Sequence, residues 1–159
     1  MNSMKEFNSQ ICTTREQSER LLALGLKKET ADMCWWDNGY GSCAIISRPA
    51  EKEDGEYGKV IPAWSLHRLI ELCPYVIKSL PALHLTMSSD SVFYCTEDNN
   101  EEYEKPFSRY TNMYDNYIEC IEWLIKEGYF NKEYLVDQEA IEEHCKGVLE
   151  YLDYIRKED

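Results

Sequence analysis

The stretch NMYDNYIECIEWLIKEG, residues 112–128, has the pattern of an amphipathic helix and is the strongest indicator of the fold. Its apolar residues recur at spacings of four, three and four, so they share one face of a helix. A glycine at position 128 is typical of the residue just beyond a helix end. We therefore expect a helix over 112–127 that buries one face. The residues on that face are Tyr114, Ile118, Ile121 and Ile125.

Two shorter helices are predicted upstream of this stretch. Thr13 or Thr14 begins the first, because each has an acid or amide three residues later, the pattern of a capping box. Gly25 ends that helix in the usual C-terminal position. The second helix begins after Ser65 and ends before Pro74, because proline disfavours helical backbone in the residue before it.

A fourth helix is predicted downstream, over 138–156, with Asp137 as its N-cap. Apolar side chains form a continuous stripe along it. The residues of the stripe are Ile141, Cys145, Val148, Leu152 and Ile155.

Strand signals are fewer. Residues 83–87 and 92–94 have strand composition and are separated by the turn residues 88–91, so we expect a β-hairpin over 83–94. A short strand is predicted at 44–47. Residues 34–43, with their glycines and asparagine, are predicted to be a turn-rich loop.

The predicted fold class is a single α+β domain over 1–159, with about four helices around a small antiparallel sheet that contains the 83–94 hairpin. Residues 48–59 and 97–105 are expected as exposed loops, and 133–159 as a C-terminal helical extension. A chain of this length can bury about 70% of the surface that its unfolded form exposes, so a sizeable core is expected.

The charge is strongly acidic and uneven. The formal net charge is −13, of which residues 1–96 carry −2 and residues 97–159 carry −11. Such a surface repels phosphate backbones and anionic lipid, so nucleic acid and membrane are poor partners. A basic protein is the partner that this charge favours. The expected contact segment contains Glu97, Asp98, Glu101 and Glu102.

A second candidate interaction site is the segment Asp32-Met33-Cys34-Trp35-Trp36-Asp37. Adjacent tryptophans can stack on a flat ligand or anchor a protein interface, with the flanking acids adding polar contacts. The alternative is that Trp35, Trp36 or both fill the core, and we favour this alternative because large aromatic side chains dominate core energetics.

No pattern of catalytic, metal-ligating or cofactor-binding residues is recognised in the sequence, so no such residue and no cofactor is predicted. This favours a non-catalytic protein but does not exclude an enzyme, because catalytic residues can be far apart in sequence. The seven cysteines are scattered, and the N-terminus lacks the apolar run of a signal peptide. We therefore expect a cytoplasmic protein with reduced thiols.

Three segments resemble one family of proteins. Residues 13–33 contain T-x-E-Q-S, L-L-x-L-G and T-A-D-M, residues 61–66 read I-P-A-W-S-L, and residues 122–129 read E-W-L-I-x-x-G-Y. This order is similar to that in small acidic proteins, without an assigned activity, encoded by phages, prophages and mobile elements of Bacteroides-type gut bacteria. The resemblance covers most of the chain between residues 13 and 130. It implies a bacterial cytoplasm and an accessory role.

The function predicted from these observations is that of an accessory module that binds another protein. Two alternatives belong to other classes. One is an acidic decoy that mimics nucleic acid and occupies a DNA-binding protein. The other is a small-molecule or enzymatic pocket near Trp35 and Trp36.

Overall fold

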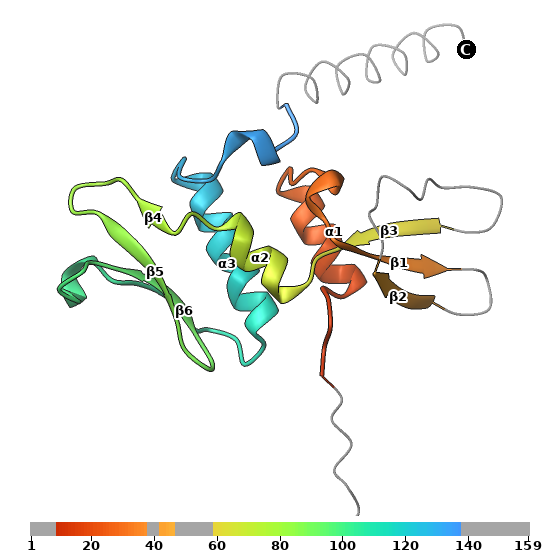
Figure 1. Ribbon diagram of the computed structural model, residues 1–159, viewed down its shortest axis with the longest axis horizontal. Coiled ribbons are helices and arrows are strands. Elements are labelled where there is room, and N and C mark those ends of the chain that lie inside the picture. Colours follow the sequence, from red (N-terminus) through yellow and green to blue (C-terminus); the bar gives the residue numbers. More distant parts are fainter. Residues whose placement is uncertain (1–8, 38–41, 47–58, 138–159) are drawn as a thin grey trace, which may run out of the picture.

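The computed structural model describes residues 9–37, 42–46 and 59–137. Three α-helices lie in the middle of this part of the chain, with an antiparallel sheet at each end (Figure 1). The helices are α1 (Arg15–Ala23), α2 (Leu66–Leu72) and α3 (Met113–Lys126). The strands are β1 (Met33–Asp37), β2 (Ser42–Ile46), β3 (Lys59–Ala63), β4 (Val76–Ile77), β5 (Leu83–Met87), β6 (Val92–Cys95) and β7 (Lys105–Phe107).

Side-chain caps fix where the helices begin. Thr14 accepts a hydrogen bond from the Gln17 backbone N–H, and the Gln17 side chain accepts one from the Thr14 backbone N–H, which completes the capping box of α1. Ser65 caps α2 and Asn112 caps α3 in the same way, each through a side-chain oxygen. These three predicted helix starts are therefore confirmed.

Glycine ends two of the helices. Gly25 follows α1 with a φ of 93°, and Gly128 follows α3 with a φ of 76°. Side chains with a Cβ rarely adopt this left-handed backbone, so glycine is the residue that such a chain reversal favours. The predicted ends of both helices are confirmed.

The four-stranded sheet has the order β4-β5-β6-β7 and contains the predicted hairpin. In the hairpin, Leu85 pairs with Tyr94 and Met87 with Val92. The backbone N–H of Ser88 donates to the Ser91 carbonyl at 2.8 Å and closes the turn. The strand β7 lies at the edge of the sheet beside β6, and Pro106 is its middle residue.

The three-stranded sheet was not predicted. It has the order β2-β1-β3, so Met33–Asp37, expected within or beside a loop, forms the central strand. The strand β3 contains Pro62, and no strand was predicted in this part of the chain. Proline cannot donate to a sheet ladder and is confined to edge strands, and β3 is an edge strand. The proline makes the composition of β3 untypical of a strand, but a strand at the edge of a sheet tolerates it.

The predicted number of helices and sheets is wrong, although the α+β class holds. The described residues contain three α-helices and two antiparallel sheets, where about four helices and one small sheet were expected. The expected helix at 138–156 and most of the expected loop at 48–59 lie outside the described residues.

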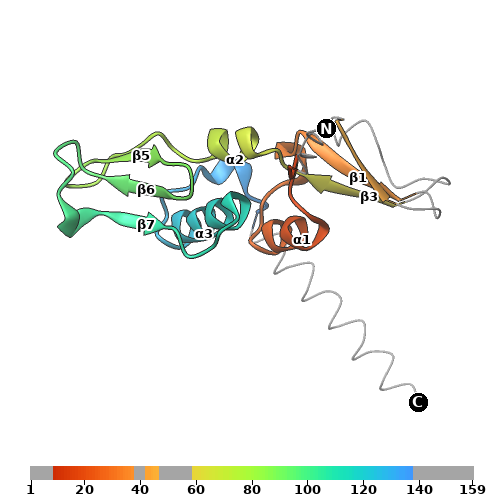
Figure 2. The same ribbon diagram turned by 90° about the horizontal axis from the view of Figure 1, so that it is seen from below.

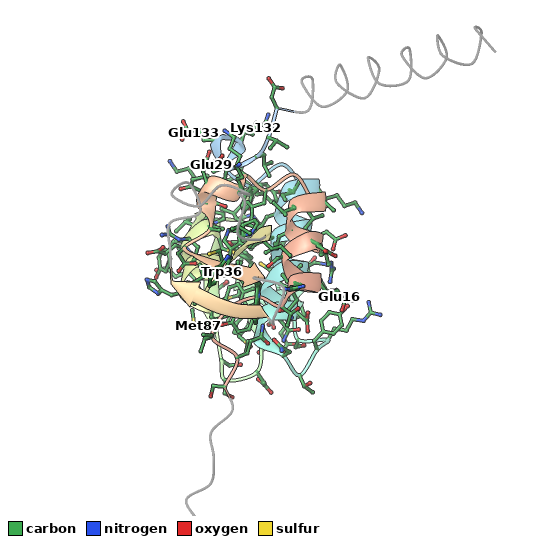
Figure 3. The ribbon with its side chains drawn as sticks, turned by 90° about the vertical axis from the view of Figure 1, so that its right-hand side faces the viewer. Glu16, Glu29, Trp36, Met87, Lys132 and Glu133 are labelled. Carbon is green, nitrogen blue, oxygen red and sulfur yellow. The ribbon has the colours of Figure 1, made fainter. Side chains whose placement is uncertain are left out.

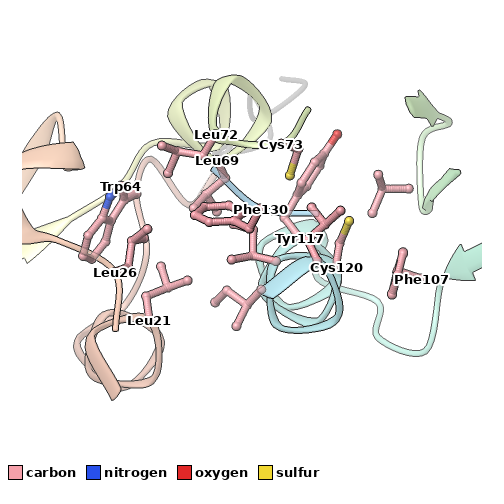
Figure 4. Packing of buried hydrophobic residues seen from close by; sticks show 14 of the residues in the cluster. Leu21, Leu26, Trp64, Leu69, Leu72, Cys73, Phe107, Tyr117, Cys120 and Phe130 are labelled. Carbon is pink, nitrogen blue, oxygen red and sulfur yellow. The ribbon is translucent and has the colours of Figure 1, made fainter. Parts of the chain in front are cut away.

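The main core joins all three helices to the four-stranded sheet. Figure 4 shows its buried side chains as one continuous group from Leu21 of α1 to Phe107 of β7. The predicted apolar face of α3 supplies Ile118 and Ile121, neither of which is exposed to solvent. Each such burial contributes about 1.5–3 kcal/mol. A smaller cluster of Cys12, Met33 and Ala63 joins the three-stranded sheet to the segment before α1.

Candidate functional site

Asp32, a predicted interaction residue, supports the start of α2. Its carboxylate accepts two hydrogen bonds from Ser65, one from the backbone N–H at 2.8 Å and one from Oγ at 2.5 Å. Ser65 is itself the N-cap of α2 and accepts from the Arg68 N–H at 3.2 Å. Both carboxylate oxygens therefore have intramolecular partners, and we assign Asp32 a structural role.

Trp35 is held within the molecule. Its Nε1 donates to the Thr13 carbonyl at 2.8 Å, and its ring packs against the cluster of Cys12, Met33 and Ala63. The indole N–H is therefore hydrogen-bonded, and part of the ring is covered, by residues of the same chain. This position fits the core role that the sequence analysis favoured.

Trp36 is half-buried and lies on the opposite face of β1 from Trp35, because adjacent residues of a strand point to opposite faces. Figure 3 looks onto the end of the molecule formed by the three-stranded sheet and labels Trp36 there. The two tryptophans therefore do not form one stacking platform. A flat ligand in a pocket near Trp35 and Trp36 could therefore not stack on both rings at once.

The acidic segment borders a hollow of about 340 Å³, which we call the acidic hollow. Of the four acids predicted to contact a partner, Glu97 and Asp98 line it, whereas Glu101 and Glu102 are exposed on the adjoining 3-10 helix, Glu101–Tyr103. The residues lining the hollow are Pro81, Ala82, His84, Thr96, Glu97, Asp98, Asn100 and Tyr103.

Hydrogen bonds at the end of β6 fix the acidic hollow. Thr96 Oγ1 accepts from the Asn100 N–H at 2.9 Å, and Asn100 Oδ1 accepts from the Glu102 N–H at 3.1 Å. Between them, Asn99 has a φ of 52°, a left-handed conformation that asparagine tolerates better than most residues. The turn thus places Glu97 and Asp98 at defined positions.

The Asp98 carboxylate is held in its charged form. A hydrogen bond from the Thr96 side chain is the main cause that lowers the pKa of Asp98 below its ordinary value of 3.8, and backbone N–H groups of Asp98 and Asn100 add to the effect. Hydrogen bonds to a carboxylate favour its ionised form. The hollow therefore keeps a negative charge at neutral pH and below.

Exposed apolar side chains adjoin the acidic hollow. Leu80, directly before the lining residue Pro81, is fully exposed, and Tyr103 in the lining is 43% exposed. Tyr75 is 73% exposed, and its ring meets the edge of the His84 ring with centroids 6.5 Å apart. Sequence reasoning missed these residues, although a tyrosine within the acidic run EEYE was a signal that could have found Tyr103.

The cysteines with described side chains are five buried free thiols. Burial raises the pKa of the Cys12 thiol from 9.0 to about 11. Because the thiolate is the nucleophile and the metal ligand, such a thiol is unreactive at neutral pH. Within the described residues, no group of three or more His, Cys, Asp or Glu is arranged to hold a metal ion.

The comparisons with known proteins do not assign a family or a function. Family models, curated proteins and solved structures give no match to this chain. In the part of the chain that the structure describes, no helix has the length and apolar character needed to span a membrane. The function must therefore be argued from the geometry above.

Proposed function

We propose that this chain is a non-catalytic module that binds a basic protein through the acidic hollow. One observation carries the proposal: Glu97, Asp98 and the exposed ring of Tyr103 line one hollow of about 340 Å³. Two carboxylates and an aromatic ring are the groups that bind a lysine or arginine head group, by charge-assisted hydrogen bonds and by the attraction of a cation to a ring face.

The apolar surroundings suit the rest of such a side chain. Lysine and arginine have long aliphatic stems that pack on apolar surface while the charged head stays in a polar environment. Pro81 and Ala82 line the same hollow, and the exposed Leu80 precedes them. A basic side chain entering here would place its stem on these residues and its head group near Glu97 and Asp98.

Charge supports a protein partner over nucleic acid. The segment 97–104 carries five carboxylates and no base, and it would repel a phosphate backbone. A decoy that mimics nucleic acid would need two rows of acids at phosphate-like spacing, whereas these acids gather around one turn. The resemblance to phage and mobile-element proteins adds the proposal of an accessory role in a bacterial cytoplasm.

Hexalysine is a defined probe for the acidic hollow. We expect it to shift the amide resonances of residues 96–103 in proton–nitrogen correlation spectra. The double variant Glu97→Gln, Asp98→Asn should weaken binding about tenfold, which corresponds to ~1.4 kcal/mol. The matched control Glu16→Gln, Glu29→Gln changes the net charge equally at exposed positions that do not line the hollow, and it should bind like the parent.

The contribution of Tyr103 is tested separately. Tyr103→Phe keeps the ring and should keep the affinity, whereas Tyr103→Ser should lower it. Shifts spread over all acidic faces of the protein, or equal losses in the double variant and its control, would contradict the proposed site.

A further inference from the structure

A second hollow, of about 370 Å³, lies between α1, the edge strand β7 and α3, and has the opposite charge; we call it the cationic hollow. Figure 2 shows these three elements in a row along one side of the molecule. Four bases and two acids line it, although the whole chain has a net charge of −13. The residues lining it are Arg20, Lys105, Phe107, Arg109, Tyr110, Glu119, Glu122, Trp123 and Lys126.

The periodicities of α3 and β7 bring these residues together. Glu119, Trp123 and Lys126 are four and three residues apart, so they lie on one face of α3, away from the buried Ile118 and Ile121. In a strand, residues two apart point to the same face, so Lys105 and Phe107 both face Trp123. The Phe107 and Trp123 rings have centroids 5.7 Å apart.

Aromatic rings hold two of the cations at the hollow. Lys105 Nζ lies 5.8 Å from the Phe107 ring centroid and 5.9 Å from that of Trp123. The Arg109 guanidinium carbon lies 5.6 Å from the Tyr110 ring centroid. These distances are within the ~6 Å at which a ring face attracts a cation. The contacts hold Lys105 and Arg109 against rings that line the hollow.

A buried asparagine fixes the loop that carries Arg109. The Asn116 side chain is fully buried, donates to the Tyr110 carbonyl at 2.9 Å and accepts from the Tyr110 N–H at 3.0 Å. It also donates to the Asp90 carbonyl at 3.1 Å. Tyr110, and with it the neighbouring Arg109, is therefore positioned by the core of the protein.

Only one of the four bases is neutralised by a carboxylate within the described residues. Arg20 Nη2 lies 2.7 Å from Glu122 Oε2, and this hydrogen bond raises the pKa of the Arg20 guanidinium. Elsewhere in the described residues, the Glu71 carboxylate lies 3.2 Å from Arg68 Nη1 and 3.2 Å from His67 Nε2. Lys105, Arg109 and Lys126 thus retain positive charge that a bound anion could neutralise.

We propose that the cationic hollow binds a small phosphate-bearing ligand. A guanidinium fork matches phosphate oxygens in a bidentate way, and lysine ammonium groups add point charges. The volume lies within the 300–1,000 Å³ typical of small-molecule sites. A long polyanion would extend beyond the hollow and be repelled by a chain whose net charge is −13, so the charge distribution selects a small anion. This site is separate from the acidic hollow and does not depend on its function.

Pyrophosphate at constant ionic strength is the first probe. We expect it to shift the amide resonances of residues 105–110 and 119–126. The triple variant Lys105→Gln, Arg109→Gln, Lys126→Gln should bind at least about tenfold more weakly. The matched control Lys28→Gln, Lys78→Gln, Lys132→Gln removes the same charge from exposed positions outside the hollow and should bind like the parent.

Two further ligands distinguish the source of the phosphate. If AMP binds more tightly than ribose 5-phosphate, the ligand is a nucleotide whose base packs on the aromatic rings that line the hollow. If the two affinities are equal, the ligand is a phosphorylated sugar. Equal weakening in both triple variants, absence of binding by all three probes, or tighter binding of single-stranded DNA at the same residues would overturn the proposal. The acidic-hollow double variant should bind pyrophosphate at least as tightly as the parent, which separates the two sites.

Discussion

At the scale of single residues, side chains that look suited to binding are used to join segments far apart in the chain. Asp32 holds the start of α2 through Ser65, and Trp35 reaches the Thr13 carbonyl. Thr13 in turn accepts from the Trp64 N–H through its side chain at 3.0 Å. The sequence shows that these residues are polar or aromatic, but their partners are 22 to 51 positions away. Local patterns cannot predict such long-range pairing.

Asp32→Ala should therefore destabilise the protein. It removes two hydrogen bonds to a charged acceptor at a helix start, and we expect a loss of about 2 kcal/mol in the free energy of unfolding. Thermal denaturation followed by circular dichroism measures this, and Asp32→Asn should recover part of the loss because it keeps an acceptor oxygen. The exposed Glu29→Ala is the control. An unchanged melting temperature for Asp32→Ala would show that the carboxylate is available for other contacts.

Buried tyrosines and thiols predict a loss of stability in alkali. Burial is the main cause that raises the pKa of Tyr94 and of Tyr117 well above 10.0, and it raises that of Cys12 to about 11. In the unfolded chain these groups ionise at lower pH, at about 8.5 for cysteine and about 10 for tyrosine. Their contribution to stability is therefore complete below about pH 8.5. It declines as the pH rises from there toward the higher pKa values of the folded protein.

A pH titration with two probes tests this. Tyrosinate absorbance should show a late step that coincides with the loss of ellipticity, because Tyr94 and Tyr117 ionise only when the protein unfolds. Tyr94→Phe should reduce the size of that step. Complete tyrosine ionisation while the ellipticity is still native would contradict the assigned burial.

At the scale of secondary-structure elements, the three described α-helices, the 83–94 hairpin and most of β2 were predicted, whereas the strands β1, β3, β4 and β7 were not. Helix starts and ends depend on short motifs, such as Thr14 with Gln17 or Gly128 after α3, and these act within one turn. The strands β3 and β7 each contain a proline, and neither was predicted as a strand. Only strand order shows that both are edge strands, and strand order is a property of the folded chain.

Ile121→Asp should unfold or aggregate the protein. The Ile121 side chain is fully buried in the main core, where an unpaired carboxylate cannot be solvated. Ile121→Val should cost only about 0.5–1.5 kcal/mol, and the exposed Glu127→Gln should be neutral. Chemical denaturation of the three variants measures these differences. A denaturation midpoint of Ile121→Asp close to that of the parent would show that the faces of α3 are wrongly assigned.

At the scale of the whole molecule, the sequence showed that acidic residues outnumber basic ones, but not that basic residues gather around one hollow. Residues 97–109 contribute to both hollows, with Glu97, Asp98 and Tyr103 in the acidic one and Lys105 and Arg109 in the cationic one. The cationic hollow also needs Arg20 from α1 and Lys126 from α3. The net charge of the chain does not say where its charged residues lie. Only the folded structure shows that the acidic hollow and the cationic hollow are separate.

This charge separation predicts the class of partner. A basic protein should associate by electrostatic steering, which weakens as the Debye length shortens from ~30 Å at 0.01 M salt to ~8 Å at physiological ionic strength. Duplex DNA should show no binding under the same conditions, because the surface around residues 97–104 repels it. Salt-sensitive binding of DNA or RNA by the parent protein would reverse the choice of partner.

The most direct test of the acidic hollow is the affinity for hexalysine across a salt series. One variant neutralises Glu97, Asp98, Glu101 and Glu102 to Gln or Asn, and its control neutralises the exposed Glu16, Glu19, Glu29 and Glu133 to Gln, so both change the net charge by the same four units. We predict that the first variant binds at least about tenfold more weakly, with a shallower salt dependence, and that the control stays within about twofold of the parent. Equal losses of affinity in both variants would contradict the account. So would an affinity that changes neither with salt nor with any of the eight substitutions.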